Sequence, residues 1–212
     1  MNHKEEKSTT VLVDVYIAEL PVHAPLGEVA NATRREEIES AKSEGVKREK
    51  YFVWRLLAYA LSHSLGLTLD SLDIRRASYG GWSLDGISLS LSHSKNALAV
   101  ALSHEAVGVD IEHIHTPRAR GIAERVMSEE ELSAYHALPE EERTQRFIEI
   151  WTAKEALFKS QGEPLFLPHK INTVGASVRT LHLEISGEDY ILSVASEHLA
   201  SLRLVTGVDL TE

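Results

Sequence analysis

The segment VGVDIEHIH, from Val107 to His115, places two carboxylates two residues apart in an apolar run. Side chains on a β-strand alternate between its two faces, so Asp110 and Glu112 project to the same side if this run is a strand. Like charges in this arrangement repel each other unless a positive charge lies between them. The pattern therefore predicts that a cation binds here.

A third carboxylate lies in IWTAKEALFKSQG, from Ile150 to Gly162. If this segment is a helix, Trp151, Glu155 and Lys159 share one side because they are spaced four residues apart. Taken alone, the segment is typical of an amphipathic helix whose aromatic side chains enter the core. Considered together with the earlier pair of carboxylates, however, its glutamate indicates a binding site.

The three carboxylates Asp110, Glu112 and Glu155 form a set of oxygen ligands suited to a hard cation such as Mg²⁺. Mg²⁺ keeps several waters and bridges carboxylates to substrate phosphates. Lys154 and Lys159 would then supply phosphate-binding charges beside the metal. We interpret the missing positive charge as a magnesium ion.

Two histidines after the first carboxylates raise a rival hypothesis, since His113 and His115 could ligate zinc. His113 shares a strand face with Ile111 and His115, however, and that face is opposite to Asp110 and Glu112. The spacing does not gather one compact zinc site, so it favours magnesium.

The segment ISLSLSHS, from Ile87 to Ser94, alternates strictly and ends in a histidine between two serines. A lone histidine is more often a structural residue, but His93 at a strand end also fits a phosphate contact. A basic cluster precedes the apolar run at Phe52, and glutamates interleave with it. This cluster is either a solvated helix face or an anion site. Its members are Arg34, Arg35, Lys42, Lys47, Arg48 and Lys50.

The composition bounds the class of protein. The chain has 212 residues, of which 43% are hydrophobic, and it has no cysteine, which excludes disulfides and thiolate metal sites. The net charge of -10 argues against nucleic-acid binding. The polar start, MNHKEEKSTT, is unlike a signal peptide, and no apolar run is long enough to span a membrane. We therefore expect a cytoplasmic protein with no membrane partner.

Hydrophobic periodicity and turn residues predict an α+β fold. The expected strands cover residues 11–17, 87–94, 96–103, 106–112, 179–186, 189–196 and 199–206. The expected helices cover residues 36–65, 118–127 and 140–161. A further helix is expected to begin at the capping box of Ser128. Each half of the chain would pack one long helix on a small antiparallel sheet. We expect two lobes that divide near residues 103–107, one of residues 1–105 and one of residues 106–212.

The motifs together resemble a known family. G-V-D-I-E at Gly108–Glu112, followed about forty residues later by W-T-A-K-E-A-L-F-K at Trp151–Lys159, is similar to the signature of the 4'-phosphopantetheinyl transferases. The long form of that family also has a strand ending in S-H-S, as at Ser92–Ser94 here. The three motifs together are specific, and the resemblance covers roughly Arg76 to Gly162.

The resemblance implies an activity and an architecture. Members transfer phosphopantetheine from coenzyme A to a serine of an acyl, peptidyl or aryl carrier protein, and release adenosine 3',5'-bisphosphate. Members of this length resemble a pseudo-twofold pair of lobes with coenzyme A in the cleft between them, so a monomer would suffice. Two alternatives stay open, which are a non-catalytic homologue that binds coenzyme A or a carrier protein, and an unrelated Mg²⁺-dependent phosphohydrolase.

The resemblance also implies roles for the motif residues. Asp110, Glu112 and Glu155 would bind Mg²⁺ together with the pyrophosphate of coenzyme A. Glu155 would be the general base that deprotonates the serine hydroxyl, directly or through a metal-bound water. Lys154 and Lys159 would hold the pyrophosphate region.

The remaining contacts with coenzyme A would come from the first half of the chain. Ser92 and His93 would contact phosphates, with His93 at the 3'-phosphate. The family often has R-x-x-x-G-K-P before its S-H-S strand; Arg76 and Gly80 match it, but Gly81-Trp82 replaces Lys-Pro, which puts the contacts of that loop in doubt. Basic residues are expected at the 3'-phosphate, and a basic or apolar face is expected to dock the carrier, although the arginines after Glu112 would equally fit a solvated basic helix. The candidates are Lys42, Lys47 and Arg48 for the phosphate, and Arg118, Arg120 and Arg125 for docking.

Overall fold

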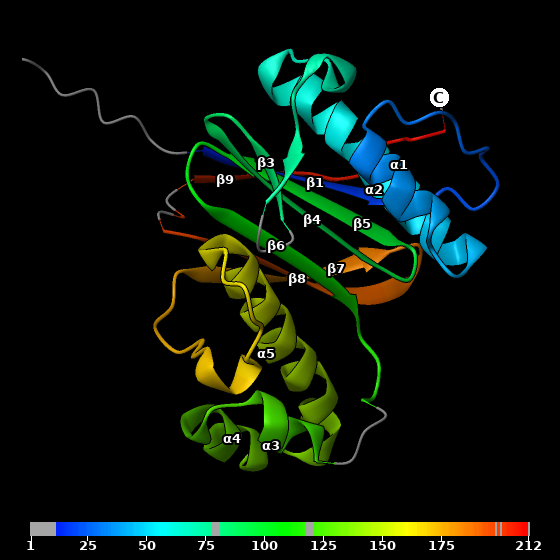
Figure 1. Ribbon diagram of the computed structural model, residues 1–212. Helices are drawn as coiled ribbons and strands as arrows, with labels where there is room; N and C mark the ends of the chain where they lie inside the picture. The colour runs from blue at the N-terminus through cyan, green and yellow to red at the C-terminus, as the bar shows by residue number, and fades with distance from the viewer. Residues whose placement is uncertain (1–11, 78–80, 118–120, 198, 200, 212) are drawn as a thin grey trace, which may run out of the picture.

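The computed structural model describes residues 12–77, 81–117, 121–197, 199 and 201–211, and it shows an α+β protein (Figure 1). Its helices are α1 (Ala32–Glu39), α2 (Glu44–Leu65), α3 (Ile122–Val126), α4 (Glu129–His136) and α5 (Glu140–Gln161), with 3-10 turns at Leu69–Ser71 and Pro168–Lys170. Its strands are β1 (Leu12–Glu19), β2 (Arg75–Arg76), β3 (Trp82–Leu84), β4 (Ile87–Ser94), β5 (Ala97–Ser103), β6 (Val107–His113), β7 (Val178–Ile185), β8 (Glu188–Ser196) and β9 (Ser201–Val205).

The strands form two sheets. One sheet has the order β2-β3-β4-β5-β1-β9, and the other has the order β6-β8-β7. The expectation of purely antiparallel sheets is wrong for the first sheet, because β9 pairs with β1 in parallel, with Asp14 opposite Arg203. The last strand of the chain therefore completes the sheet that the first strand begins.

The sheets and the long helices are stacked in layers, as Figure 1 shows. Side chains alternate along β1, so that Val13 and Val15 face the core between the two sheets and Tyr16 faces the core under α2. The same alternation on β8 sends Leu192 between the sheets and Ile191 toward α5. The resulting order is α2, first sheet, second sheet, α5.

The helix ends follow local sequence signals, with one exception. The capping box at Ser128 opens α4 as predicted, and Gly162, with a φ of 65°, ends α5. The expected single helix over residues 36–65 is wrong, because α1 ends at Glu39 and α2 begins after Ser43, whose side chain accepts a hydrogen bond from the Val46 N–H. The helix expected over residues 118–127 is limited to α3 among the described residues.

No helix among the described residues is both long enough and apolar enough to cross a membrane.

Candidate functional site

The three predicted carboxylates come from β6 and α5. On β6, Val109 and Ile111 are fully buried in the core between the sheets, so Asp110 and Glu112 project to the other side, as the alternation predicts. Helix α5 packs against this side and carries Glu155. The register of one strand and the approach of one helix therefore decide how closely the carboxylates lie.

Gly108 allows that close approach. A Cβ atom at this position would lie 1.9 Å from the carbonyl oxygen of Ala156 and 2.7 Å from the backbone nitrogen of Ser160. Both atoms belong to the backbone of α5, so no side-chain rotation could relieve such a clash. The glycine two residues before Asp110 therefore allows α5 to lie directly on β6, which brings Glu155 and Lys159 to the carboxylates.

Lys159 joins the carboxylates to the strand that carries the S-H-S motif. Its Nζ atom donates to Asp110 Oδ1 at 2.7 Å, to the Val109 carbonyl at 3.1 Å and to Ser92 Oγ at 3.4 Å. The other carboxylate oxygen, Asp110 Oδ2, is buried and has no hydrogen-bond partner. A buried, unpaired carboxylate oxygen is unfavourable by itself and is suited to bind a cation.

The electrostatics also indicate a shortage of positive charge. Burial, followed by the charges of Asp110 and Glu112, raises the pKa of Glu155 to about 7, and Lys159 opposes the shift only in part. Burial also raises the pKa of Glu112, with a contribution from Asp110 and an opposing hydrogen bond from Ser94. The three carboxylates therefore repel one another, and a bound dication would relieve that repulsion.

The donor set fits a hard metal ion in its chemistry, although the groups are not assembled around one point. Within the described part of the chain, no three carboxylate or imidazole groups converge closely enough to hold a metal as they stand. Asp110 is engaged by Lys159, and Glu112 is engaged by Ser94. His113 lies against Lys95, so the zinc hypothesis gains no support.

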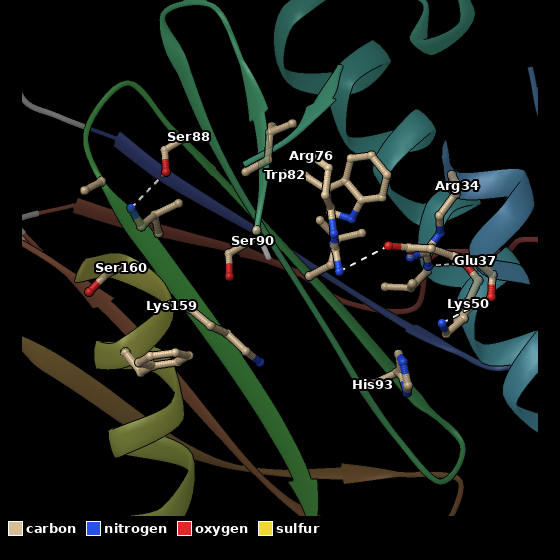
Figure 2. Close-up of a pocket in the computed structure, with 17 residues that line it drawn as sticks. Arg34, Glu37, Lys50, Arg76, Trp82, Ser88, Ser90, His93, Lys159 and Ser160 are labelled. Atoms are coloured by element: carbon tan, nitrogen blue, oxygen red, sulfur yellow. Dashed lines mark hydrogen bonds and ion pairs between the residues drawn. The ribbon is translucent and has the colours of Figure 1, made fainter. Parts of the chain in front are cut away.

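A cleft of about 360 Å³ adjoins the carboxylates, and Lys159 belongs to both (Figure 2). The N-terminal part of the chain supplies much of its wall, with residues from α1, α2, β3 and β4. The polar and aromatic side chains that line it include Arg34, Lys50, Arg76, Trp82, His93 and Lys159. A concave site with several cations is suited to an anionic ligand.

Trp82 supports the cationic wall of the cleft. The guanidinium of Arg76 lies 4.9 Å from its ring centroid, and that of Arg34 lies 5.9 Å away. Both arginines also pair with Glu37, at 3.1 Å for Arg76 and 3.0 Å for Arg34. The residue that departs from the family pattern therefore positions two cations, while Gly80 lies outside the described residues.

His93 lies within this positive surrounding. Burial lowers its pKa to about 4, with further lowering by the charges of Arg34, Lys159 and Lys50. The imidazole is therefore neutral at pH 7, with its Nδ1 atom 3.4 Å from Glu49 Oε2. The same three cations that disfavour a protonated histidine would attract a phosphate group.

Two predicted lysines are not in the site. Lys154 is fully buried, forms an ion pair with Glu131 Oε2 at 2.6 Å, and donates to the carbonyls of Pro168 and Ile171. Its assignment to the pyrophosphate is therefore corrected, because its position on α5 turns it into the protein interior. Lys47 pairs with Glu44 at 2.8 Å on the outside of α2 and does not line the cleft.

The sequence interpretation also missed residues that line the cleft. Arg34 and Lys50 were members of the basic cluster, but nothing separated them from their neighbours. One local signal was available, since Asn31 caps α1 and accepts a hydrogen bond from the Arg34 N–H, which fixes where that helix begins. Of the expected docking arginines, Arg125 is exposed on α3, whereas Arg118 and Arg120 lie outside the described residues.

Carboxylates beside a cationic cleft are suited to bind phosphate groups and a metal ion, and comparison with known proteins shows which family the chain resembles. Residues 106–206 match the model of the 4'-phosphopantetheinyl transferase superfamily. The chain is similar to the 4'-phosphopantetheinyl transferases gsp of Aneurinibacillus migulanus, Sfp of Bacillus subtilis strain 168 and AcpT of Escherichia coli O157:H7, with 29%, 35% and 34% identity. Residues 106–206, just under half of the chain, are therefore similar to this superfamily.

The matched segments cover part of each protein. They span 53%, 37% and 56% of this chain, and 48%, 34% and 60% of gsp, Sfp and AcpT respectively. The chain thus matches less than two thirds of the length of these relatives. The second half of the chain, which carries the three carboxylates and Lys159, includes the region matched by the family model.

Proposed function

We propose that this protein transfers 4'-phosphopantetheine from coenzyme A to a serine of an acyl, peptidyl or aryl carrier protein, with Mg²⁺, and releases adenosine 3',5'-bisphosphate. One observation carries the proposal. Lys159 hydrogen-bonds to Asp110 and also lines the cationic cleft, so the site that would hold the metal is continuous with the site that would hold the phosphates. The match of residues 106–206 to the superfamily model supports the same reaction.

In this proposal the cleft binds coenzyme A through its phosphates. Arg34, Lys50 and His93 surround the part of the cleft in which a terminal phosphate would be stabilised by charge and by a neutral imidazole donor. Lys159 and Ser92 lie nearer the carboxylates and would hold the pyrophosphate. These assignments replace Lys47 and Lys154.

Asp110, Glu112 and Glu155 would hold the metal ion. Bound Mg²⁺ would neutralise the pyrophosphate oxygens and make the phosphorus more open to attack. Glu155 would accept the proton of the carrier serine, because a serine hydroxyl is a poor nucleophile until a nearby base takes its proton. Lys159 would stabilise the charge that develops on the departing phosphate.

The proposal extends to the architecture and the assembly. Residues 1–105 and 106–212 would form two similar lobes related by a pseudo-twofold axis, with coenzyme A bound between them and a monomer as the working unit. Strand β9 of the second half joins the sheet of the first lobe. Two features support the two-lobe arrangement, which are the 22-residue length of both α2 and α5 and the packing of each helix on a different sheet.

Intact-protein mass spectrometry of an apo carrier protein tests the reaction. The carrier is incubated with this protein, coenzyme A and Mg²⁺, and we expect a gain of one phosphopantetheine that needs both the metal and the carrier serine. No gain with an acyl and a peptidyl carrier, together with retained binding of coenzyme A, would favour the non-catalytic homologue. Hydrolysis of coenzyme A without any carrier would favour a phosphohydrolase.

A further inference from the structure

Four serines on one face of β4 connect the two sheets. Each hydroxyl oxygen accepts a hydrogen bond from a backbone N–H of β6, although β4 and β6 belong to different sheets. Ser88, Ser90, Ser92 and Ser94 accept from Val107, Val109, Ile111 and His113, at 3.1, 2.9, 3.3 and 3.3 Å. Each pair is separated by 19 residues, so β4 and β6 run in the same direction in a fixed register.

Two of these serines also donate a hydrogen bond. Ser92 donates to Asp110 Oδ1 at 2.7 Å, and Ser94 donates to Glu112 Oε2 at 2.5 Å. Both of these acceptors lie 18 residues after their serine. The residues 18 positions after Ser88 and Ser90 are Ala106 and Gly108, which have no side-chain acceptor. Ser88 and Ser90 therefore only connect the two strands, whereas Ser92 and Ser94 also bind the predicted metal ligands Asp110 and Glu112.

The direction of these hydrogen bonds matters. A hydroxyl that accepts from an amide N–H is polarised in the sense that strengthens its own donation. The backbone of β6 thus fixes Ser94, and Ser94 in turn fixes the Glu112 carboxylate on the same strand. Asp110 does not depend on its serine to the same degree, because Lys159 also holds it at 2.7 Å.

We propose that Ser94 is a positioning residue that orients Glu112 for metal binding. The inference rests on the proposed function, since that function makes Glu112 a ligand. Groups that hold a metal ligand in place typically affect metal affinity by about ten- to a hundredfold. Loss of the Ser94 hydroxyl should therefore weaken the metal site and leave the two sheets in place, because three other serines still bridge β4 and β6.

Ser94→Ala and Ser90→Ala form a matched pair for the test. Each variant removes one hydroxyl that accepts from β6, but only Ser94 donates to a carboxylate. Mn²⁺ affinity is measured by EPR of the free aqua ion, without coenzyme A because Ser90 also lines the cleft. We expect Ser94→Ala to weaken Mn²⁺ binding about tenfold, Ser94→Thr to restore it, and Ser90→Ala to leave it within about twofold of wild type.

Equal Mn²⁺ affinity of Ser94→Ala and wild type would overturn the inference, and so would an equal loss in Ser90→Ala. Absence of Mn²⁺ binding by the wild-type protein would overturn it as well. The carrier assay is a separate measurement, so the positioning role of Ser94 and the proposed transfer reaction can be rejected independently of each other. If wild type binds Mn²⁺ and Ser94→Ala does not, while no carrier is modified, the positioning role holds and the proposed reaction fails.

Discussion

At the scale of single residues, Glu155 is a proposed base whose position in the fold lowers stability at neutral pH. Its pKa is about 7, against an ordinary value of 4.5, because of burial and the charges of Asp110 and Glu112. The folded state therefore binds a proton more tightly than the unfolded state. In metal-free protein, the free energy of unfolding should fall as pH rises from about 4.5 to about 7, and the loss is complete above that range.

Replacement of Glu155 by glutamine should separate stability from activity. The neutral amide cannot ionise, so metal-free Glu155→Gln should be more stable than wild type at pH 8 by about 1–3 kcal/mol, with little difference at pH 4.5. If the proposed reaction holds, transfer should be nearly abolished, because the proposed metal ligand and base are both lost. Urea unfolding at both pH values and the carrier assay measure the two effects.

The control for this prediction is Glu141→Gln, which changes an exposed glutamate in the first turn of the same helix. This substitution should leave the change in free energy of unfolding between pH 4.5 and pH 8 as in wild type, and it should not alter the transfer rate. A destabilised Glu155→Gln at pH 8, or one with wild-type turnover, would contradict the assignment of Glu155.

Lys154 and Lys159 belong to one motif but have opposite roles. Removing one partner of a buried ion pair leaves the other charge unpaired, so Lys154→Met should lower the free energy of unfolding by about 3–5 kcal/mol. Lys159→Met should destabilise much less, since Lys159 is partly exposed, yet it should weaken coenzyme A binding strongly. Chemical unfolding and calorimetric titration with coenzyme A distinguish the two. Equal stability losses would contradict this division.

The partner of Lys154 adds a pH test. Burial alone would raise the pKa of Glu131, but hydrogen bonds from Lys154 and Thr173 outweigh it and lower the pKa to about 2. A lowered carboxylate pKa contributes stability that is present above pH 4.5 and is lost as pH falls toward 2. The destabilisation caused by Lys154→Met should therefore be smaller at pH 3 than at pH 7. Urea unfolding of both proteins measures it, and an equal difference in the free energy of unfolding at the two pH values would contradict the prediction.

The sequence could predict that carboxylates from β6 and α5 lie near one another, but not which lysine lies beside them. The carboxylates were found because strand alternation and helix spacing are local rules, which the register of β6 obeys. The choice between Lys154 and Lys159 depends on Glu131, which α4 brings against α5 from 23 residues earlier in the chain. Contacts of that kind are set by tertiary packing, and the sequence pattern around a motif does not encode them.

At the scale of elements, the contact between β6 and α5 decides whether a site exists. Gly108→Ala would place a methyl group 1.9 Å from the Ala156 carbonyl, so α5 must move away from β6. We expect a loss of about 2–4 kcal/mol in stability. Metal affinity should fall as well, because Glu155 moves with the helix. Thermal unfolding and Mn²⁺ titration measure the two losses.

Gly45→Ala is the matched control, since the nearest atom to its added Cβ is Ser43 Oγ at 3.9 Å. In the first turn of α2 this change should be neutral or slightly stabilising, because alanine favours a helix more than glycine does. A Gly108→Ala protein with wild-type stability would show that the backbone of α5 tolerates displacement, which would contradict the argument from close approach.

Most elements could be predicted from the sequence, and the exceptions have physical causes. Strict alternation predicted β4, while a capping box and a terminal glycine marked the ends of α4 and α5. The break between α1 and α2 was missed, because the helical pattern of residues 36–65 continues across Ser43. A serine there is compatible with a helix surface and with a cap, and only packing decides between them.

At the scale of the whole molecule, the first and last described strands, β1 and β9, lie side by side in one sheet. Arg203 on β9 binds Asp14 on β1 through two hydrogen bonds, from Nε at 2.7 Å and Nη2 at 2.5 Å. Ser64 on α2 donates to the same carboxylate at 2.6 Å. Local periodicity predicted a strand at residues 199–206, but it could not reveal a parallel pairing across almost the whole chain.

This closure predicts a single cooperative unfolding transition. The four serines of β4 connect the two sheets, and β9 brings a strand from the second half of the chain into the first sheet, so neither half should unfold first. In a Trp151→Phe variant, the fluorescence of Trp54 and Trp82 reports the unfolding of the first half of the chain. Far-UV circular dichroism reports the unfolding of the whole chain. The two midpoints should coincide in urea, and two separated transitions would contradict the prediction.

Arg203→Gln then tests whether the last strand is part of that unit. The substitution leaves the carboxylate of Asp14 buried without its cation, and we expect a loss of about 1–3 kcal/mol because Arg203 is itself partly exposed. Both probes should shift to lower urea together, since β9 supports the sheet on which α2 packs. Asp14→Asn combined with Arg203→Gln should recover part of the loss, because the unpaired charge is then removed. A shift seen by only one probe would mean that β9 stabilises one half alone.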